Sequence, residues 1–181
     1  MNLQKLVFVA LTFLVACATE QPRETARAMT SVVNTVTIAG PADAVFELVT
    51  TARFWPQWHP ATQAVGGVTE RPYGLGDRIH ERGRIGKLEF STTWRVAEYV
   101  RGTRVILQSE KSQTRITYTF QTLDGRTVFT RNLEYNRDNF ATVAADLTAA
   151  EELIRVQSEQ AVNQLKALVE KILRQESSEL S

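Results

Sequence analysis

The chain has 181 residues, and 21 Lys and Arg against 20 Asp and Glu give a formal net charge of +1 with neutral histidine. This balance argues against a general nucleic-acid-binding protein, which needs a clear basic excess, and the hydrophobic fraction of 43% argues against intrinsic disorder. The single cysteine, Cys17, excludes an intramolecular disulfide and a multi-cysteine zinc site.

The first 17 residues have the pattern of an export signal. Lys5 precedes an apolar run over 6–16 that is too short for the ~20 residues of a membrane-spanning helix. Cys17 ends this run in the sequence Leu-Val-Ala-Cys, which resembles a bacterial lipobox. We therefore expect a lipoprotein, lipidated at Cys17, on the periplasmic face of a bacterial membrane. The alternatives are ordinary signal-peptidase cleavage, which would leave a soluble periplasmic or secreted protein, and an uncleaved anchor.

The rest of the chain predicts a flexible tether, one strand, two short helices, more strands and a long helix. Residues 18–31 lack apolar periodicity and form the predicted tether. β-branched residues predict a strand over 32–38, and Gly40-Pro41 ends it before a helix over 42–50. A second short helical segment covers 52–58. Alternation then predicts six strands, over 64–70, 77–85, 88–100, 104–109, 114–122 and 126–135.

An apolar stripe predicts a long helix over 138–174, with a break or kink before Ala149 and a frayed tail over 175–181. A meander of antiparallel strands with one apolar face must cover that face, and this helix carries the one long stripe available. We therefore predict an α+β domain over 32–174, in which a curved antiparallel sheet of about seven strands wraps around the C-terminal helix. A mainly apolar cavity of at least ~300 Å³ is expected between them.

Four short motifs occur in a characteristic order along the chain. They are Gly40-Pro41 at the first helix, Phe-Trp-Pro-Gln-Trp-His-Pro over 54–60, Gly-Leu-Gly-Asp over 74–77 and Trp-Arg-Val-Ala-Glu-Tyr over 94–99. Together they resemble the START-like SRPBCC superfamily, in particular its polyketide cyclase/dehydrase and lipid-transport branch. The resemblance implies the helix-grip fold. It does not decide the function, because that family includes lipid carriers, cyclases, hormone receptors and quinone-binding proteins. Thr51-Ala52 stands where the family commonly has an Asp, so any role of that Asp is absent here.

No catalytic motif is present by spacing. The sequence lacks a nucleophile elbow, a His-Glu-x-x-His helix and a Walker loop. Gly74 and Gly76 lie between two predicted strands, which is unlike a phosphate-binding loop before a helix. His59 and His80 would need a third ligand to hold a catalytic metal. We predict no metal, no cofactor and no assigned catalytic residue.

Residues that alternation or position turns inward are the candidates for the cavity wall. They are Trp55, Trp58, His59, Glu81, Phe90, Trp94, Tyr118, Phe120, Phe129, Arg131 and Tyr135. For His59 two interpretations remain open, a polar group at the cavity mouth and a turn histidine packed on tryptophan. The two short-helix tryptophans likewise line the pocket or fill the core.

Arg131 is the anomaly, because it shares a strand face with Phe129, Leu133 and Tyr135. A charge that faces a core is costly unless it is paired. Arg131 could pair with Glu81, bind a ligand carboxylate, or be turned outward by strand twist.

These observations favour an exported binding or carrier protein for an apolar small molecule, such as a lipid, an isoprenoid or a polyketide. The expected partners are that ligand and a membrane, reached through the N-terminal lipid anchor; nucleic acid is not expected. The alternative is an enzyme of the cyclase or dehydratase type that uses polar cavity residues. The sequence favours the binder because no acid/base pair stands out.

Overall fold

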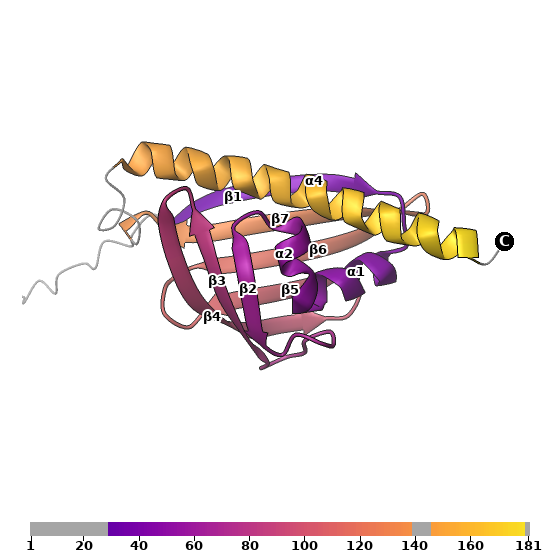
Figure 1. The fold of residues 1–181 in the computed structure, drawn as a ribbon. Coiled ribbons are helices and arrows are strands. Elements are labelled where there is room, and N and C mark those ends of the chain that lie inside the picture. Colours follow the sequence, from indigo (N-terminus) through magenta and orange to yellow (C-terminus); the bar gives the residue numbers. More distant parts are fainter. Residues whose placement is uncertain (1–28, 139–145, 180–181) are drawn as a thin grey trace, which may run out of the picture.

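The computed structural model describes residues 29–138 and 146–179. It contains one antiparallel sheet of seven strands in the order β1-β7-β6-β5-β4-β3-β2 (Figure 1). The elements are β1 (Met29–Ile38), α1 (Ala42–Thr50), the 3-10 helix η1 (Ala52–Phe54), α2 (Trp55–Trp58), β2 (Thr62–Gly67), β3 (Arg78–Ile85), β4 (Leu88–Val100), β5 (Arg104–Ser109), β6 (Arg115–Leu123), β7 (Arg126–Asn136) and α4 (Leu147–Glu179). The predicted α+β class and element order are confirmed.

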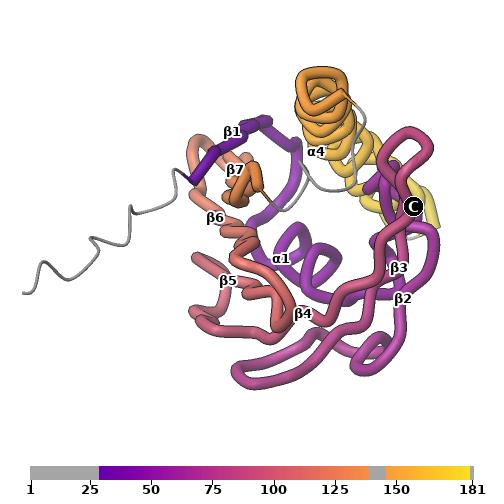
Figure 2. The backbone as a smooth tube through the Cα atoms, turned by 90° about the vertical axis from the view of Figure 1, so that its left-hand side faces the viewer, coloured from indigo at the N-terminus to yellow at the C-terminus, as the bar shows by residue number. Residues whose placement is uncertain are grey.

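The sheet curls strongly, and α4 closes the curl. Figure 2 shows the strands passing from β1 through β4 to β2, with α1 inside the curve and α4 across the gap between its two ends. α4 contacts β1, β3, β7 and α2. Its buried residues Ala161, Leu165 and Val169 follow the helical period and anchor it to the core.

Alternation sets the inner and outer faces of the strands. On β3, Ile79, Glu81 and Gly83 are buried, while Arg78, His80 and the other alternate residues are exposed. A strand turns successive side chains to opposite faces, so this pattern follows from the sequence. The inner face supplies the wall that α4 covers.

Several predicted boundaries need correction. Residues 29–31, expected in the tether, begin β1 because they pair with residues 134–136 of β7. Residues 175–179, expected to fray, continue α4. β2 begins at Thr62 rather than at 64, because Thr62 pairs with Gly83 across an irregularity in the ladder.

Three sequence predictions lie outside the described residues. These are the export signal with Cys17, most of the tether, and the segment 139–145 in which a break before Ala149 was expected. α4 is described from Leu147 onward. In the part of the chain that the structure describes, no helix is both long and apolar enough to cross a membrane.

Candidate functional site

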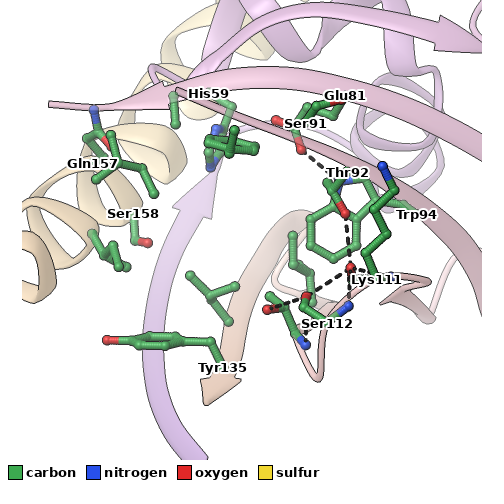
Figure 3. A pocket seen from close by; sticks show the side chains of 18 of the residues that line it. His59, Glu81, Ser91, Thr92, Trp94, Lys111, Ser112, Tyr135, Gln157 and Ser158 are labelled. Carbon is green, nitrogen blue, oxygen red and sulfur yellow. Dashed lines mark hydrogen bonds between the residues drawn. The ribbon is translucent and has the colours of Figure 1, made fainter. Parts of the chain in front are cut away.

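A cavity of about 250 Å³ lies between the sheet and the N-terminal half of α4 (Figure 3). Its wall consists of His59, Ala61, Glu81, Ile85, Phe90, Ser91, Thr92, Trp94, Ser109, Lys111, Ser112, Thr114, Ile116, Arg131, Leu133, Tyr135, Ile154, Gln157 and Ser158. This volume is below the ~300 Å³ at the low end of ligand pockets, so the predicted size of the cavity is wrong, and the shortfall counts against the carriage of a large ligand. A ligand confined to this cavity must therefore be small.

Arg131 points into the protein and is only 2% exposed. Its Nη1 donates a hydrogen bond to Ser158 Oγ at 3.0 Å, and its Nη2 donates to His59 Nε2 at 3.1 Å. Both partners are neutral. Among the described residues, its buried Nε has no hydrogen-bond partner. The interpretation in which strand twist turns Arg131 outward is therefore wrong.

Glu81 is the second buried charged group of the cavity, 5% exposed. Its Oε1 accepts a hydrogen bond from Thr62 Oγ1 at 2.5 Å, and its Oε2 accepts one from Trp94 Nε1 at 2.7 Å. Glu81 and Arg131 do not pair directly. They are joined through His59 and Thr62, and we call these four residues the polar chain.

The hydrogen bonds of the polar chain have one consistent direction. Thr62 has a single hydroxyl proton, which it donates to Glu81. The 3.1 Å contact between Thr62 Oγ1 and His59 Nδ1 therefore requires that Nδ1 carries the histidine proton. Nε2 of His59 is then the unprotonated nitrogen, and it accepts from Arg131. In every hydrogen bond of the polar chain, the donor thus lies on the Arg131 side and the acceptor on the Glu81 side.

Burial shifts the pKa values of the titratable groups in and beside the polar chain. Burial, and then the positive charge of Arg131, lowers the pKa of His59 well below its usual value. Burial raises the pKa of Glu81, against the opposing effects of the Thr62 and Trp94 hydrogen bonds and the Arg131 charge. Burial also raises the pKa of Tyr118 to about 12. At neutral pH His59 is therefore a neutral bridge, and the carboxyl group of Glu81 takes up a proton more readily than an exposed glutamate does.

Six of the predicted wall residues lie in the cavity wall: His59, Glu81, Phe90, Trp94, Arg131 and Tyr135. His59 combines its two interpretations, since it also packs edge-on against Trp58 at 5.7 Å between ring centroids.

Five predicted wall residues lie in the core instead: Trp55, Trp58, Tyr118, Phe120 and Phe129. The short helices α1 and α2 cause this difference, because they fill the half of the sheet's concave inner face that does not border the cavity. Phe46 of α1 contacts Phe120 at 5.0 Å, and Trp58 of α2 contacts Tyr118 at 6.4 Å between ring centroids. The same inward face therefore forms packed core under the short helices and a cavity beyond them.

The sequence analysis missed two polar parts of the wall. Ser158 and Gln157 enter from α4, while Lys111 and Ser112 enter from the β5–β6 hairpin on the opposite side (Figure 3). Ser109 Oγ lies 2.9 Å from both Thr92 Oγ1 and Ser112 Oγ, which ties that hairpin to β4. Ser158 was detectable as a polar residue inside the apolar stripe of the helix. The hairpin carried no comparable signal, because short polar turns are common.

Metal binding has no support in the described part of the chain, where no group of three or more His, Cys, Asp or Glu is placed to hold an ion. The described wall of the cavity offers one guanidinium, one ammonium group, one carboxyl group, one imidazole, one amide and several hydroxyl groups.

A curved sheet that grips a long helix over a cavity defines the helix-grip class of domains. The family model described as polyketide cyclase / dehydrase and lipid transport matches residues 29–170, and the chain belongs to this family. No curated protein matches the chain.

Solved structures share this fold at low sequence identity. The Zhui aromatase/cyclase from Streptomyces sp. R1128 is 18% identical, with a TM-score of 0.65 over 81% of this chain and 96% of that one. A START superfamily protein from Mycobacterium smegmatis is 15% identical, with a TM-score of 0.60 over 78% and 98%. A major latex-like protein from Panax ginseng is 13% identical, with a TM-score of 0.57 over 77% and 96%. These similarities establish the fold, and the site itself must indicate the ligand.

Proposed function

We propose that this protein binds and carries a small molecule with an apolar body and a carboxylate head, and that Arg131 holds the head. The observation that carries this proposal is the environment of Arg131. The guanidinium lines the cavity, is buried, contacts neutral hydrogen-bond partners and retains a buried N–H without a partner among the described residues. Because neither hydrogen-bond partner is charged, the guanidinium can still take a carboxylate directly, and its planar shape matches the geometry of that group.

The remaining wall suits the body of such a ligand. Ile85, Phe90, Ile116, Leu133 and Ile154 give the cavity an apolar side. Burying the apolar part of the ligand there stabilises the complex by about 25 cal/mol per Å² removed from water. The small volume favours a medium-chain or single-ring acid over a complete membrane lipid.

Decanoate and decanol separate the contribution of the head from that of the body. Isothermal titration calorimetry on the full chain should show that decanoate binds ~10-fold or more tightly than decanol, since a hydrogen bond to a charged group is worth about 1.5–3 kcal/mol. Equal affinities, or no binding of decanoate, would contradict the proposal.

An enzyme of the dehydratase type is the second candidate. One observation favours it: the buried carboxyl group of Glu81, whose pKa is raised, lines the same cavity as Arg131. A carboxyl group with a raised pKa can act as a general acid. Incubation with β-hydroxydecanoate distinguishes the candidates by mass spectrometry, since an enzyme of this type removes one water from the acid and a carrier returns it intact.

We also propose that the chain is exported and anchored to a membrane through a lipid on Cys17. The apolar run over 6–16 and the lipobox-like sequence that ends at Cys17 support this localisation. Mass spectrometry of the mature N-terminus should find a lipid-modified chain that begins at Cys17. A mature chain that begins at Thr19 would instead indicate ordinary signal-peptidase cleavage and a soluble exported protein.

A further inference from the structure

Glu81 has no part in the proposed carrier role, although it is buried in the same cavity as Arg131. We propose that the binding of a carboxylate at Arg131 is coupled to the uptake of one proton by Glu81, so that the cavity takes an organic anion together with a proton. This inference rests on the proposed carrier function and specifies its ligand class, monoanionic organic acids, and its dependence on pH.

The two buried charged groups of the cavity wall balance each other. Among the described residues, Arg131 and Glu81 are the only charged side chains that are fully buried. Together they are neutral, and the two residues between them, His59 and Thr62, are neutral as well. Without a ligand, Glu81 is therefore the counter-charge of Arg131, acting through the polar chain.

A ligand carboxylate changes this balance. Placed beside Arg131, it leaves two negative charges against one positive charge among the buried groups of the described wall, while Lys111 lies on the solvent-exposed hairpin. Two carboxylates that share one site cannot both stay ionised at neutral pH, and the pKa of one of them is strongly raised. The ligand carboxylate would lie directly against the guanidinium, whereas Glu81 is separated from it by two residues. Glu81 is therefore the group that takes the proton from solvent.

The other groups around Glu81 are poor proton acceptors. Thr62 already donates its hydroxyl proton to Glu81, and Nε2 of His59 already accepts from Arg131. His59 is further disfavoured as an acceptor because its pKa is lowered, whereas burial has already raised the pKa of Glu81 before any ligand enters.

The elements packed around Glu81 contribute few further charges. Tyr118 on β6 has a pKa of about 12 and stays neutral. Lys111 lines the cavity from the β5–β6 hairpin and is exposed to solvent. β4 contributes Trp94, and α4 contributes Ser158 and Gln157, none of which titrates. Among the described residues of the cavity wall, Lys111 is thus the one rival cation for the ligand head.

The sign of the pH dependence follows from proton uptake. The complex binds one proton more than the free protein when the pH lies between the Glu81 pKa of the free protein and its higher pKa in the complex. In that window the affinity for decanoate falls as the pH rises, by up to ~10-fold per pH unit. Decanol adds no charge, so its affinity should not change with pH.

Calorimetry of the full chain in two buffers with different ionisation enthalpies, phosphate and Tris, counts the protons taken up. Decanoate should bind with uptake that approaches about one proton per ligand, and decanol should bind with none. Binding of decanoate without proton uptake would overturn this inference and leave the carrier function standing. Failure of decanoate to bind would refute the carrier function itself.

Two variants test whether Glu81 is the group that takes up the proton. Glu81→Gln should abolish proton uptake and tighten decanoate binding by ~10-fold or more, because Arg131 has then lost its internal counter-charge. Proton uptake that persists in Glu81→Gln would overturn the assignment. Lys111→Met tests the rival site, because proton uptake should persist in it if the head lies at Arg131. Loss of the uptake in that variant would overturn the inference by placing the head at the hairpin. The buffer comparison on the unmodified chain remains decisive if Glu81→Gln does not fold.

Discussion

Replacing Arg131 with methionine is expected to weaken decanoate binding by ~10-fold or more while leaving decanol binding nearly unchanged. The substitution roughly keeps the side-chain volume and removes the charge, and a charge-assisted hydrogen bond is worth about 1.5–3 kcal/mol. Calorimetry with both ligands measures the difference. An equal loss for both ligands would show a general collapse of the cavity rather than the loss of a head-group site.

The same substitution should lower the free energy of unfolding. Arg131 is 2% exposed, and its removal leaves His59 and Ser158 without their donor and Glu81 without its counter-charge. Leaving a buried polar group unsatisfied costs about 1–3 kcal/mol, and more if the group is charged. Glu81 can escape that cost by taking up a proton, and burial already raises its pKa. A carboxyl group with a raised folded-state pKa contributes stability below its unfolded-state pKa and loses it as the pH rises through the folded-state pKa. The destabilisation should therefore be larger at pH 8 than at pH 5 in urea titrations.

Arg115→Met is the matched control for this experiment. Arg115 lies on β6 and pairs with Glu134 at 2.8 Å, with side chains 46% and 22% exposed. Surface pairs of this kind contribute about 0–1 kcal/mol. If both variants change stability and affinity equally, the special role of Arg131 is refuted.

Leu165→Ala on α4 should cost about 2–5 kcal/mol of the free energy of unfolding, the usual range for a buried leucine. Leu165 is completely buried in the core, where it helps to hold α4 across the open side of the sheet. The loss combines the transfer of the removed groups with the cavity that they leave behind. Chemical denaturation measures it directly.

Leu153→Ala on the same helix is the control, because Leu153 is 41% exposed. Exposed positions of this kind usually change stability by no more than about 0.5 kcal/mol. If the two leucine variants proved equally stable, α4 would not be anchored to the core as described. The helix would then not be a fixed cover of the cavity.

The two largest expected effects concern two different regions in which α4 contacts the rest of the protein. Leu165 holds the helix by apolar packing in the half of the molecule that the short helices fill. Arg131 stands where that packing ends, and it bonds Ser158 on the N-terminal half of α4. The position of α4 thus decides both the stability of the fold and the completeness of the polar site.

The sequence by itself determined the class of fold and the direction of the key side chains. The bounds predicted for β4 and β5 agree with the structure, because alternation of apolar and polar residues over most of 88–97 and the turn over 101–103 leave little choice. The same alternation predicts that Arg131 faces inward with Phe129 and Tyr135, since residues two positions apart on a strand share a face.

Only the tertiary structure decided which inward residues form the core and which form the cavity. Phe129 and Tyr135 share one face of β7, but the short helices cover the first, whereas the second lies beyond them. The polar chain was equally hidden, because its members come from three separate parts of the chain. His59 and Thr62 share one turn, Glu81 lies on the paired strand β3, and only the tertiary structure brings Arg131 of β7 to them. Periodicity gives the face on which a side chain lies, whereas its neighbours depend on how distant elements pack in space.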